Sequence, residues 1–301
     1  MQTVPVGKTP LRSSRLVYGG WRIAGTQDAT AVTSEARKSG IAALQSAYEA
    51  GYTGFDLADV YCGGVCEEIL GEALRQTPGM REGILLATKC GIRVPGVPAG
   101  APYRYDFSAG YIADSVDVAL RRMGVSHIDL LMLHRPDFLM DPSEVAEAFG
   151  RLRSEGKVRE FGVSNFRPGQ LDLLQRYLGF PLAVHQVEIS LRQLATLSDG
   201  TLDQCQALGI SPMAWSPLGG SGPGSFSPGV VQVLAGIGER LGVTPEVVAL
   251  AWLIRHPSGI LPVVGSTKRE RIRAMARAAE IQLERDDWYR LLEAALGARL
   301  P

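Results

Sequence analysis

Short apolar runs recur along the chain, and each is followed by an amphipathic stretch. Eight of these runs predict strands, at residues 16–20, 54–58, 84–90, 128–134, 158–164, 182–189, 211–218 and 261–266. Short and nearly continuous apolar runs are typical of parallel strands that are covered on both faces.

The stretches between these runs predict helices. Three of them carry start signals: Ser34 precedes 35–50, Ser108 precedes 109–123, and Thr244-Pro245 opens 245–255. Further helices are expected at 64–76, 142–155, 168–178, 200–208 and 268–279. Two amphipathic stretches remain, at 228–241 and 285–297, and they predict extra helices before the last strand unit and at the end of the chain.

Eight strands that alternate with eight helices predict an α/β fold, the (β/α)8 TIM barrel, as one domain over residues 1–301. No linker or shift in composition divides the chain. A doubly wound sheet is the competing architecture, but no G-x-G-x-x-G motif follows the first predicted strand.

Composition excludes several classes of protein. The chain has 301 residues, 46% of them hydrophobic, and 31 Lys and Arg balance 31 Asp and Glu, so its formal net charge is zero. This composition disfavours a disordered chain, and a neutral chain has no electrostatic footprint for nucleic acid or an anionic membrane. No run approaches the ~20 apolar residues of a membrane-spanning helix. The first residues contain no apolar segment of a secretion signal, so we expect a cytoplasmic protein.

The cysteines predict neither disulfides nor a metal site. Cys62, Cys66, Cys90 and Cys205 form no C-x-x-C pair, and the histidines do not supply a matching pair of ligands. Reduced thiols are the expected state.

Polar residues interrupt the apolar runs near their carboxyl ends, where the active site of such a barrel lies. The residues concerned are Asp56, Lys89, His134, Ser164, Asn165, Gln186, Glu188, Trp215, Ser216, Gly265 and Ser266, and Tyr61 follows Asp56 by five positions. Seven predicted strands therefore deliver hydrogen-bonding groups to one end of the barrel.

Lys89 closes an apolar run, where a lysine is costly without a partner, and Asp56 is an available counter-ion. A structural ion pair is the alternative for these two residues, and a core histidine is the alternative for His134. Together with Tyr61, however, the set suits proton donation to a developing alkoxide. We expect the Lys89 ammonium to lower the pKa of Tyr61, so that the phenol acts as a general acid near neutral pH. His134 would donate to the same oxygen. The set holds no nucleophile, so a hydride carrier is expected to supply the electron pair.

In this order, the motifs resemble those of the aldo-keto reductase superfamily over essentially the whole chain. The matching segments are GFDLADVY, TKCG, DLLMLHRPD, GKVREFGVSNF, HQVEIS, AWSPLGG and VVGSTKRERI. Within the superfamily, HRPDFLMDPSEVAEAF and SDGTLDQ most resemble a bacterial branch of NADPH-dependent oxidoreductases.

The resemblance implies a role for each candidate. Tyr61 is implied as the proton donor, Lys89 and Asp56 as residues that tune it, and His134 as the residue that positions the carbonyl. The implied nicotinamide contacts are Asp56, Ser164, Asn165 and Gln186, with Trp215 stacked on the ring, and Gly20 and Trp21 beside the ribose. Without the flanking motifs, Trp21 and Trp215 would be taken as core aromatics.

Phosphate binding is expected after the last two strands, where barrels of this type often bind phosphate. Glycines follow the seventh strand in 216–229, and Ser266 or Thr267 is expected to cap the helix after the eighth. The resemblance assigns the pyrophosphate to Ser216, Pro217, Leu218, Gly219 and Gly220, and the adenosine ribose phosphate to Ser266, Lys268 and Arg271, beside Gly265. The alternative for KRERIR is a solvated basic face. The cations Lys268 and Arg271 favour NADPH, which carries an additional phosphate. NADH is kept as an alternative, because Gly265 stands where several branches of the family have a lysine for that phosphate.

Two further residues differ from the usual pattern of the family and neighbour candidate site residues in the sequence. His185 precedes Gln186 where Asn is usual, and Cys62 follows Tyr61, where a thiol would either fill the pocket or make the site sensitive to oxidation. Because no long loop follows the last helix, we expect residues 91–107 to contribute more of the substrate wall.

The main hypothesis is therefore an NADPH-dependent reductase of a small aldehyde or ketone, as a monomer or small homo-oligomer. One alternative is an NADPH-binding sensor or regulatory subunit with little turnover, as in relatives that serve as channel β-subunits. Another is a barrel isomerase or lyase that acts on a phosphorylated sugar.

Overall fold

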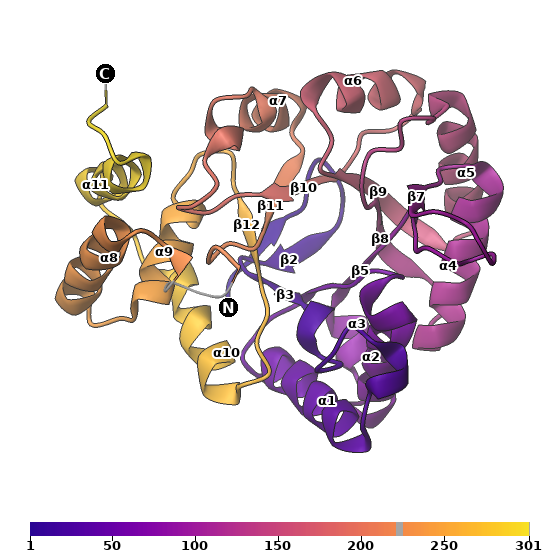
Figure 1. Ribbon diagram of the computed structural model, residues 1–301, viewed down its shortest axis with the longest axis horizontal. Helices are drawn as coiled ribbons and strands as arrows, with labels where there is room; N and C mark the ends of the chain where they lie inside the picture. The colour runs from indigo at the N-terminus through magenta and orange to yellow at the C-terminus, as the bar shows by residue number, and fades with distance from the viewer. Residues whose placement is uncertain (221–224, 301) are drawn as a thin grey trace.

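The computed structural model describes residues 1–220 and 225–300. At its centre, parallel strands form a closed barrel in the order β3, β4, β5, β8, β9, β10, β11, β12 (Figure 1). Their bounds are Val17–Gly19, Gly54–Asp56, Leu85–Cys90, Ile128–Leu133, Val158–Ser164, Val184–Glu188, Ser211–Trp215 and Leu261–Val264. The predicted (β/α)8 barrel is confirmed, and each strand lies within its predicted run.

Helices surround the barrel, one after each strand. They are α1 (Ser34–Glu49), α2 (Val65–Gln76), α4 (Ala109–Met123), α5 (Pro142–Ser154), α6 (Pro168–Tyr177), α7 (Thr201–Leu208), α9 (Pro245–Ile254) and α10 (Arg269–Ala276). The two extra helices are also present as α8 (Pro228–Leu241) and α11 (Arg285–Leu296), which pack together outside α9 at one side of the barrel (Figure 1). A short α3 (Met80–Gly83) precedes β5.

Two predicted N-cap residues are wrong. Thr33, not Ser34, is the N-cap of α1, because its Oγ1 accepts a hydrogen bond from the Ala36 amide. The predicted helix 268–279 begins one residue late and ends in a 3-10 turn, η6 (Arg277–Glu280). Its N-cap is Lys268, and Ser266 Oγ instead accepts from the Lys268 amide at 3.2 Å, which tightens the turn before the helix.

The smallest elements were not predicted, because two or three residues carry no readable periodicity. An amino-terminal hairpin, β1 (Thr3–Pro5) with β2 (Arg12–Ser14), brings Val6 and Leu11 into the apolar interior of the barrel. A second hairpin pairs β6 (Ile92–Arg93) with β7 (Arg104–Tyr105). Further 3-10 turns are η1 (Gly20–Arg22), η2 (Ala29–Ala31), η3 (Tyr61–Gly64) and η4 (Ala195–Leu197).

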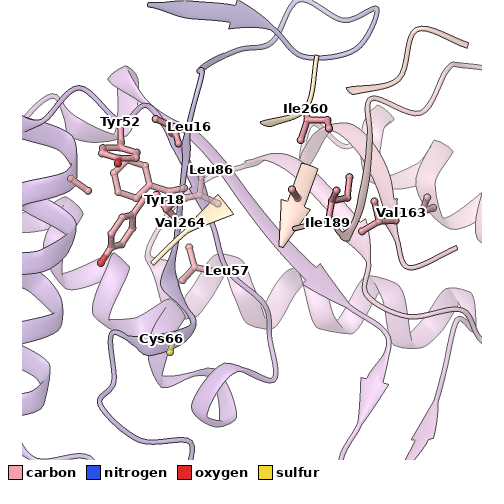
Figure 2. Close-up of a cluster of buried hydrophobic side chains, with 14 of the residues drawn as sticks. Leu16, Tyr18, Tyr52, Leu57, Cys66, Leu86, Val163, Ile189, Ile260 and Val264 are labelled. Carbon is pink, nitrogen blue, oxygen red and sulfur yellow. The ribbon is translucent and has the colours of Figure 1, made fainter. Parts of the chain in front are cut away.

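Side chains of the barrel strands alternate between two apolar layers. One set fills the barrel and includes Val17, Leu85, Ala87, Leu130, Met132, Val184, Met213, Leu261 and Val263. The other set packs outward against the helices, as Tyr18, Leu86 and Val163 do in Figure 2. This alternation decides which polar residues reach the end of the barrel.

Among the described residues, no helix combines the length and the hydropathy that a membrane crossing requires.

Candidate active site

A cavity of about 650 Å³ opens at the carboxyl ends of the barrel strands. Most predicted site residues line it: Trp21, Asp56, Tyr61, His134, Ser164, Asn165, Gln186, Trp215, Ser216, Pro217, Leu218, Gly220, Gly265, Ser266, Lys268 and Arg271. Of the other predicted residues, Gly20 and Gly219 are next to lining residues in the sequence but do not line the cavity. Lys89 does not line it either, but its ammonium contacts the Tyr61 hydroxyl. Glu188 is not among the lining residues.

The alternation of the strands explains why these particular side chains meet. Lys89 lies two residues after the inward Ala87, and His134 lies two residues after the inward Met132. The same spacing joins Val184 to Gln186 and Met213 to Trp215. Where each of these four strands leaves the apolar interior, its next inward position is therefore polar or aromatic.

Lys89 is fully buried and makes four contacts through its ammonium group. Its Nζ donates to Asp56 Oδ1 at 2.7 Å and Oδ2 at 2.8 Å, to the Leu57 carbonyl at 2.7 Å, and to the Tyr61 hydroxyl at 3.2 Å. Burial alone lowers the pKa of Lys89, but the Asp56 carboxylate and the Tyr61 hydroxyl outweigh it, so the pKa is raised. The predicted ion pair is thus present, and it includes the tyrosine.

The prediction that Lys89 brings the pKa of Tyr61 towards neutral pH is wrong. Burial raises the pKa of Tyr61, the Lys89 charge lowers it by less, and the Asp56 charge adds to the rise. The sequence shows the nearby cation but not the loss of hydration that burial brings. Tyr61 therefore stays protonated well above neutral pH, as a proton donor must.

His134 stands against Tyr61, with the two ring centroids 5.8 Å apart and the rings edge to face. Burial, with the charges of Lys89 and Arg135, holds the pKa of His134 well below its ordinary value, so the imidazole is neutral. Its Nδ1 is buried without a hydrogen-bond partner among the described residues. Tyr61 and His134 therefore offer two neutral polar groups to the same part of the cavity.

Arg122 on α4 holds the turn that carries Tyr61. Its guanidinium donates to the carbonyls of Asp59 and Gly63, each at 3.3 Å, and to Glu67 Oε2 at 3.1 Å. Gly64 has a φ of +95°, and a Cβ there would collide with this guanidinium. The turn thus requires glycine both for its backbone and for the space that Arg122 occupies.

Glu67 links this turn to the strand that carries Lys89. It is fully buried on α2, and its Oε1 accepts from Thr88 Oγ1 at 2.7 Å, one residue before Lys89. The sequence reasoning missed both Arg122 and Glu67. A signal was present, since Glu67 occupies the apolar face of a predicted amphipathic helix, where an acid needs a partner.

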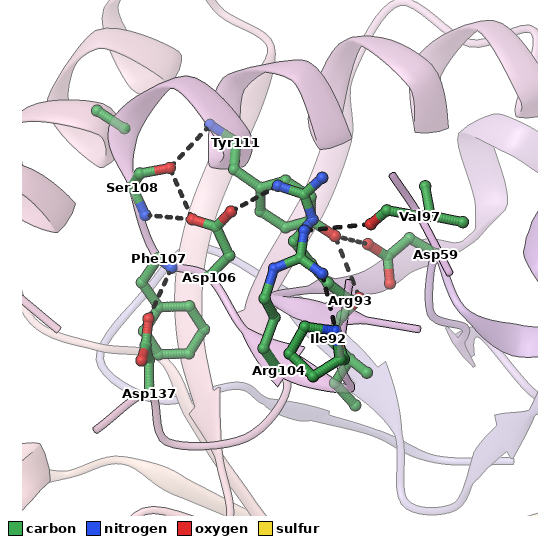
Figure 3. A network of polar contacts seen from close by, with 12 residues as sticks. Asp59, Ile92, Arg93, Val97, Arg104, Asp106, Phe107, Ser108, Tyr111 and Asp137 are labelled. Carbon is green, nitrogen blue, oxygen red and sulfur yellow. Dashed lines mark hydrogen bonds and ion pairs between the residues drawn. The ribbon is translucent and has the colours of Figure 1, made fainter. Parts of the chain in front are cut away.

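Residues 91–107 were expected to form part of the substrate wall, but none of them lines the cavity. Hydrogen bonds hold this hairpin over α4 instead, as Figure 3 shows. Arg93 pairs with Asp106 at 2.8 Å, and the Tyr111 hydroxyl donates to the Ile92 carbonyl at 3.2 Å. The same hydroxyl lies 3.5 Å from Asp59, so the hairpin is connected to the Tyr61 turn from outside.

Cys62 is buried and does not line the described cavity. Burial raises the pKa of its thiol, with a further rise from Asp28, and this opposes formation of the reactive thiolate. His185 is the other residue that differs from the usual pattern of the family. It lies between the inward Val184 and Gln186 of β10, so its side chain points outward from the barrel. Its burial lowers its pKa to about 4, so it is a neutral core residue.

The side of the cavity at β9 to β11 presents amide and hydroxyl groups. Trp215 Nε1 donates to Asn165 Oδ1 at 2.9 Å, and Asn165 Nδ2 donates to Ser164 Oγ at 2.8 Å. Gln186 Nε2 is buried and has no partner among the described residues. Because a buried amide without a partner is costly, this donor fits a ligand that carries a carbonyl, as a nicotinamide carboxamide does.

The side at β12 is cationic. Lys268 is exposed at the rim, and Arg271 lies 3.8 Å from Glu246, a loose contact. The Tyr18 hydroxyl fixes the backbone here by donating to the Ser266 carbonyl at 2.7 Å. A Cβ at Gly265 would lie 2.9 Å from the Gly19 carbonyl oxygen, so a lysine at this position would force the two strands apart.

The loop after β11 faces this cationic side. Arg22 donates to the Gly220 carbonyl at 3.2 Å, across the end of β12. Residues 221–224 of the predicted glycine-rich loop lie outside the described residues.

Several lining residues were not predicted, namely Gly19, Arg22, Arg135, Val263, Val264, Thr267 and Met275. Arg22 and Arg135 directly follow the predicted Trp21 and His134, so adjacency was the available signal. Met275 lines the cavity from α10, and no sequence pattern pointed to it.

Comparison with known proteins agrees with this geometry. The Aldo/keto reductase family matches residues 15–295. The 6-dehydroglucose reductase of Agrobacterium fabrum is 42% identical over 291 residues, which cover 95% of this chain and 96% of that protein. The thermostable aldo-keto reductase Tm1743, solved with the inhibitor epalrestat, has a TM-score of 0.86 at 25% identity and covers 98% of this chain and 100% of that one.

An aldo/keto reductase from Klebsiella pneumoniae, solved with NADP and acetate, has a TM-score of 0.81 at 25% identity and covers 97% of this chain and 94% of that one. The family match thus spans nearly the whole barrel, including every strand that contributes to the cavity. The chain therefore belongs to the aldo/keto reductase family of oxidoreductases.

Proposed function

We propose that this protein reduces the carbonyl group of a small aldehyde or ketone with NADPH. The observation that carries the proposal is the hydrogen-bonded set of Asp56, Lys89 and Tyr61, which faces a neutral His134 in a cavity with a cationic far side.

Tyr61 would deliver the proton to the carbonyl oxygen. As the hydroxyl gives up its proton, negative charge grows on the phenol oxygen, and the Lys89 ammonium already donates to that oxygen at 3.2 Å. The other three contacts of Lys89 hold the ammonium in place, so little reorganisation is needed. His134, uncharged, would donate from its ring to the substrate oxygen and orient the carbonyl carbon.

The residues fit a nicotinamide dinucleotide at two separate places. The unpartnered Gln186 amide, with Ser164 and Asn165, suits the carboxamide, while Ser266, Lys268 and Arg271 suit a ribose phosphate. Bound NADPH would supply the hydride for the carbonyl carbon. The cations at β12 favour NADPH over NADH, which lacks the additional phosphate.

A carbonyl panel assayed with NADPH and NADH in parallel tests the proposal. The panel includes 6-dehydroglucose, because of the name of the 42% identical relative, together with simple aldehydes and ketones. We expect carbonyl-dependent oxidation of NADPH, and a weaker rate with NADH. Tight NADPH binding without turnover across the panel would instead support the regulatory alternative.

A further inference from the structure

Arg135 is a cation at the catalytic end of the cavity that the proposed reaction does not use. It directly follows His134 after β8 and lines the cavity. Its guanidinium carbon lies 5.7 Å from the centroid of the Trp215 ring. Within the described part of the chain, no hydrogen bond or ion pair engages its side chain.

The other cations of the cavity lie elsewhere. In the closed barrel, β8 stands four strands away from β12, where Lys268 and Arg271 lie. Arg22 is engaged with the Gly220 carbonyl. A dinucleotide whose phosphates lie at β12 therefore does not require Arg135.

No protein anion competes for Arg135 within the cavity. Among the described lining residues the only carboxylate is Asp56, and both of its oxygens accept from Lys89. The charge of Arg135 nevertheless reaches the catalytic end, since it helps to lower the pKa of His134. A positive group thus faces the space beside the carbonyl site, with its hydrogen-bond donors available.

The contact with the Trp215 ring helps to hold this guanidinium at the cavity wall. A guanidinium is planar, and attraction to an aromatic ring uses none of its N–H groups, which stay free to donate. Those N–H groups match the two oxygens of a carboxylate, or of a phosphate or sulfonate group.

We propose that Arg135 is a specificity-determining residue that binds an anionic group on the carbonyl substrate. This inference rests on the proposed function and narrows its substrate class to carbonyl compounds that carry a carboxylate or a similar oxyanion. Arg135 takes no part in proton or hydride transfer.

The test compares 4-carboxybenzaldehyde with its methyl ester, because the two present a similar carbonyl and differ in charge. We expect the wild-type protein, with saturating NADPH, to show kcat/KM about ten- to hundredfold higher for the carboxylate, the range for a charge-assisted hydrogen bond. Arg135→Gln should lower kcat/KM for the carboxylate at least tenfold more than for the ester, and Arg135→Lys should keep part of the preference.

Arg285→Gln is the matched control. Arg285 also stacks on an aromatic ring, with its guanidinium carbon 5.3 Å from the centroid of Tyr289, but it lies on α11, away from the cavity. This variant should keep the wild-type preference. Equal kcat/KM for the two aldehydes, or an equal loss for both in Arg135→Gln, would overturn the inference.

A binding measurement separates this inference from the proposed function. Benzoate should quench tryptophan fluorescence in the wild-type protein, and Arg135→Gln should weaken its binding at least tenfold. If no carbonyl is reduced but benzoate binding still depends on Arg135, the proposed reaction fails while the anion site stands. If benzoate binds both proteins equally, the anion site fails whatever the turnover.

Discussion

The two lysines of the candidate site, Lys89 and Lys268, lie in opposite surroundings. Lys89 is buried, and its ammonium is fully engaged by Asp56, the Leu57 carbonyl and Tyr61. Lys268 lies exposed at the rim, and no ion pair holds its side chain among the described residues. In the proposed site, folding alone would therefore complete the end with Lys89, whereas the end with Lys268 would gain its negative partner only from a bound ligand. Substitutions at the two ends should differ in what they damage.

Replacing Lys89 should have the largest effect, because it damages both stability and catalysis. Lys89→Met leaves the buried Asp56 carboxylate without its counter-charge, which costs about 3–5 kcal/mol of unfolding free energy. The kcat for a carbonyl substrate should fall at least about a hundredfold. Chemical denaturation and steady-state kinetics measure the two effects.

The double variant Asp56→Asn with Lys89→Met is the control for the charge. It removes the uncompensated carboxylate, so it should regain part of the stability but none of the activity. If the single variant Lys89→Met were as stable as the wild type, the claim that Lys89 stabilises the folded site by pairing with Asp56 would be contradicted.

Arg122 tests whether the turn that carries Tyr61 needs its support. Arg122→Leu removes three hydrogen bonds to this turn and to Glu67, so kcat should fall about tenfold or more while the Kd for NADPH changes little. Arg121→Leu is the matched control, because Arg121 is the exposed neighbour on the same helix. Equal kcat values in the two variants would show that the turn holds its shape without Arg122.

Lys268 should behave in the opposite way to Lys89. Lys268→Ala should raise the KM for NADPH about tenfold, with little change in kcat, in stability or in the KM for NADH. The effect should shrink as salt is added, since an exposed charge is screened. If Lys268→Ala lost as much stability as Lys89→Met, the proposed difference between a lysine that stabilises the fold and a lysine that binds a ligand would be contradicted.

Asp59 gives an effect on stability that depends on pH. Burial, with the Glu67 charge, raises its pKa to about 7 in the folded protein, above the ordinary value of 3.8. The folded state therefore holds a proton that the unfolded state releases, so Asp59 lowers stability as pH rises from about 4 to 7. The slope attributable to one such proton approaches about 1.4 kcal/mol per pH unit.

Asp59→Asn should remove this slope. Because Glu67 also has a raised pKa, from its burial, and shifts stability in the same direction, the measurement is the difference between the wild type and the variant across that pH range. Parallel stability curves for the two proteins would show that Asp59 does not titrate in this window.

The barrel and most of the cavity follow from sequence because their patterns are periodic. Each apolar run places every second side chain inward, so the next inward residue after Ala87 or Met132, which is Lys89 or His134, had to reach the carboxyl end of the barrel. The loss of hydration on burial and the contacts between distant segments follow no periodic pattern in the sequence. The raised pKa of Tyr61 depends on how completely the fold excludes water, and Arg122 meets the Tyr61 turn from a helix about sixty residues away. The position of 91–107 likewise depends on contacts with α4 that no local pattern shows.

The most direct test of the central claim is Tyr61→Phe, which removes one hydroxyl and keeps the ring. With folding and the Kd for NADPH shown to match the wild type, kcat for carbonyl reduction should fall about a hundred- to ten-thousandfold, the range for losing a general acid. A variant that reduces the same carbonyl at the wild-type rate would contradict Tyr61 as the proton donor.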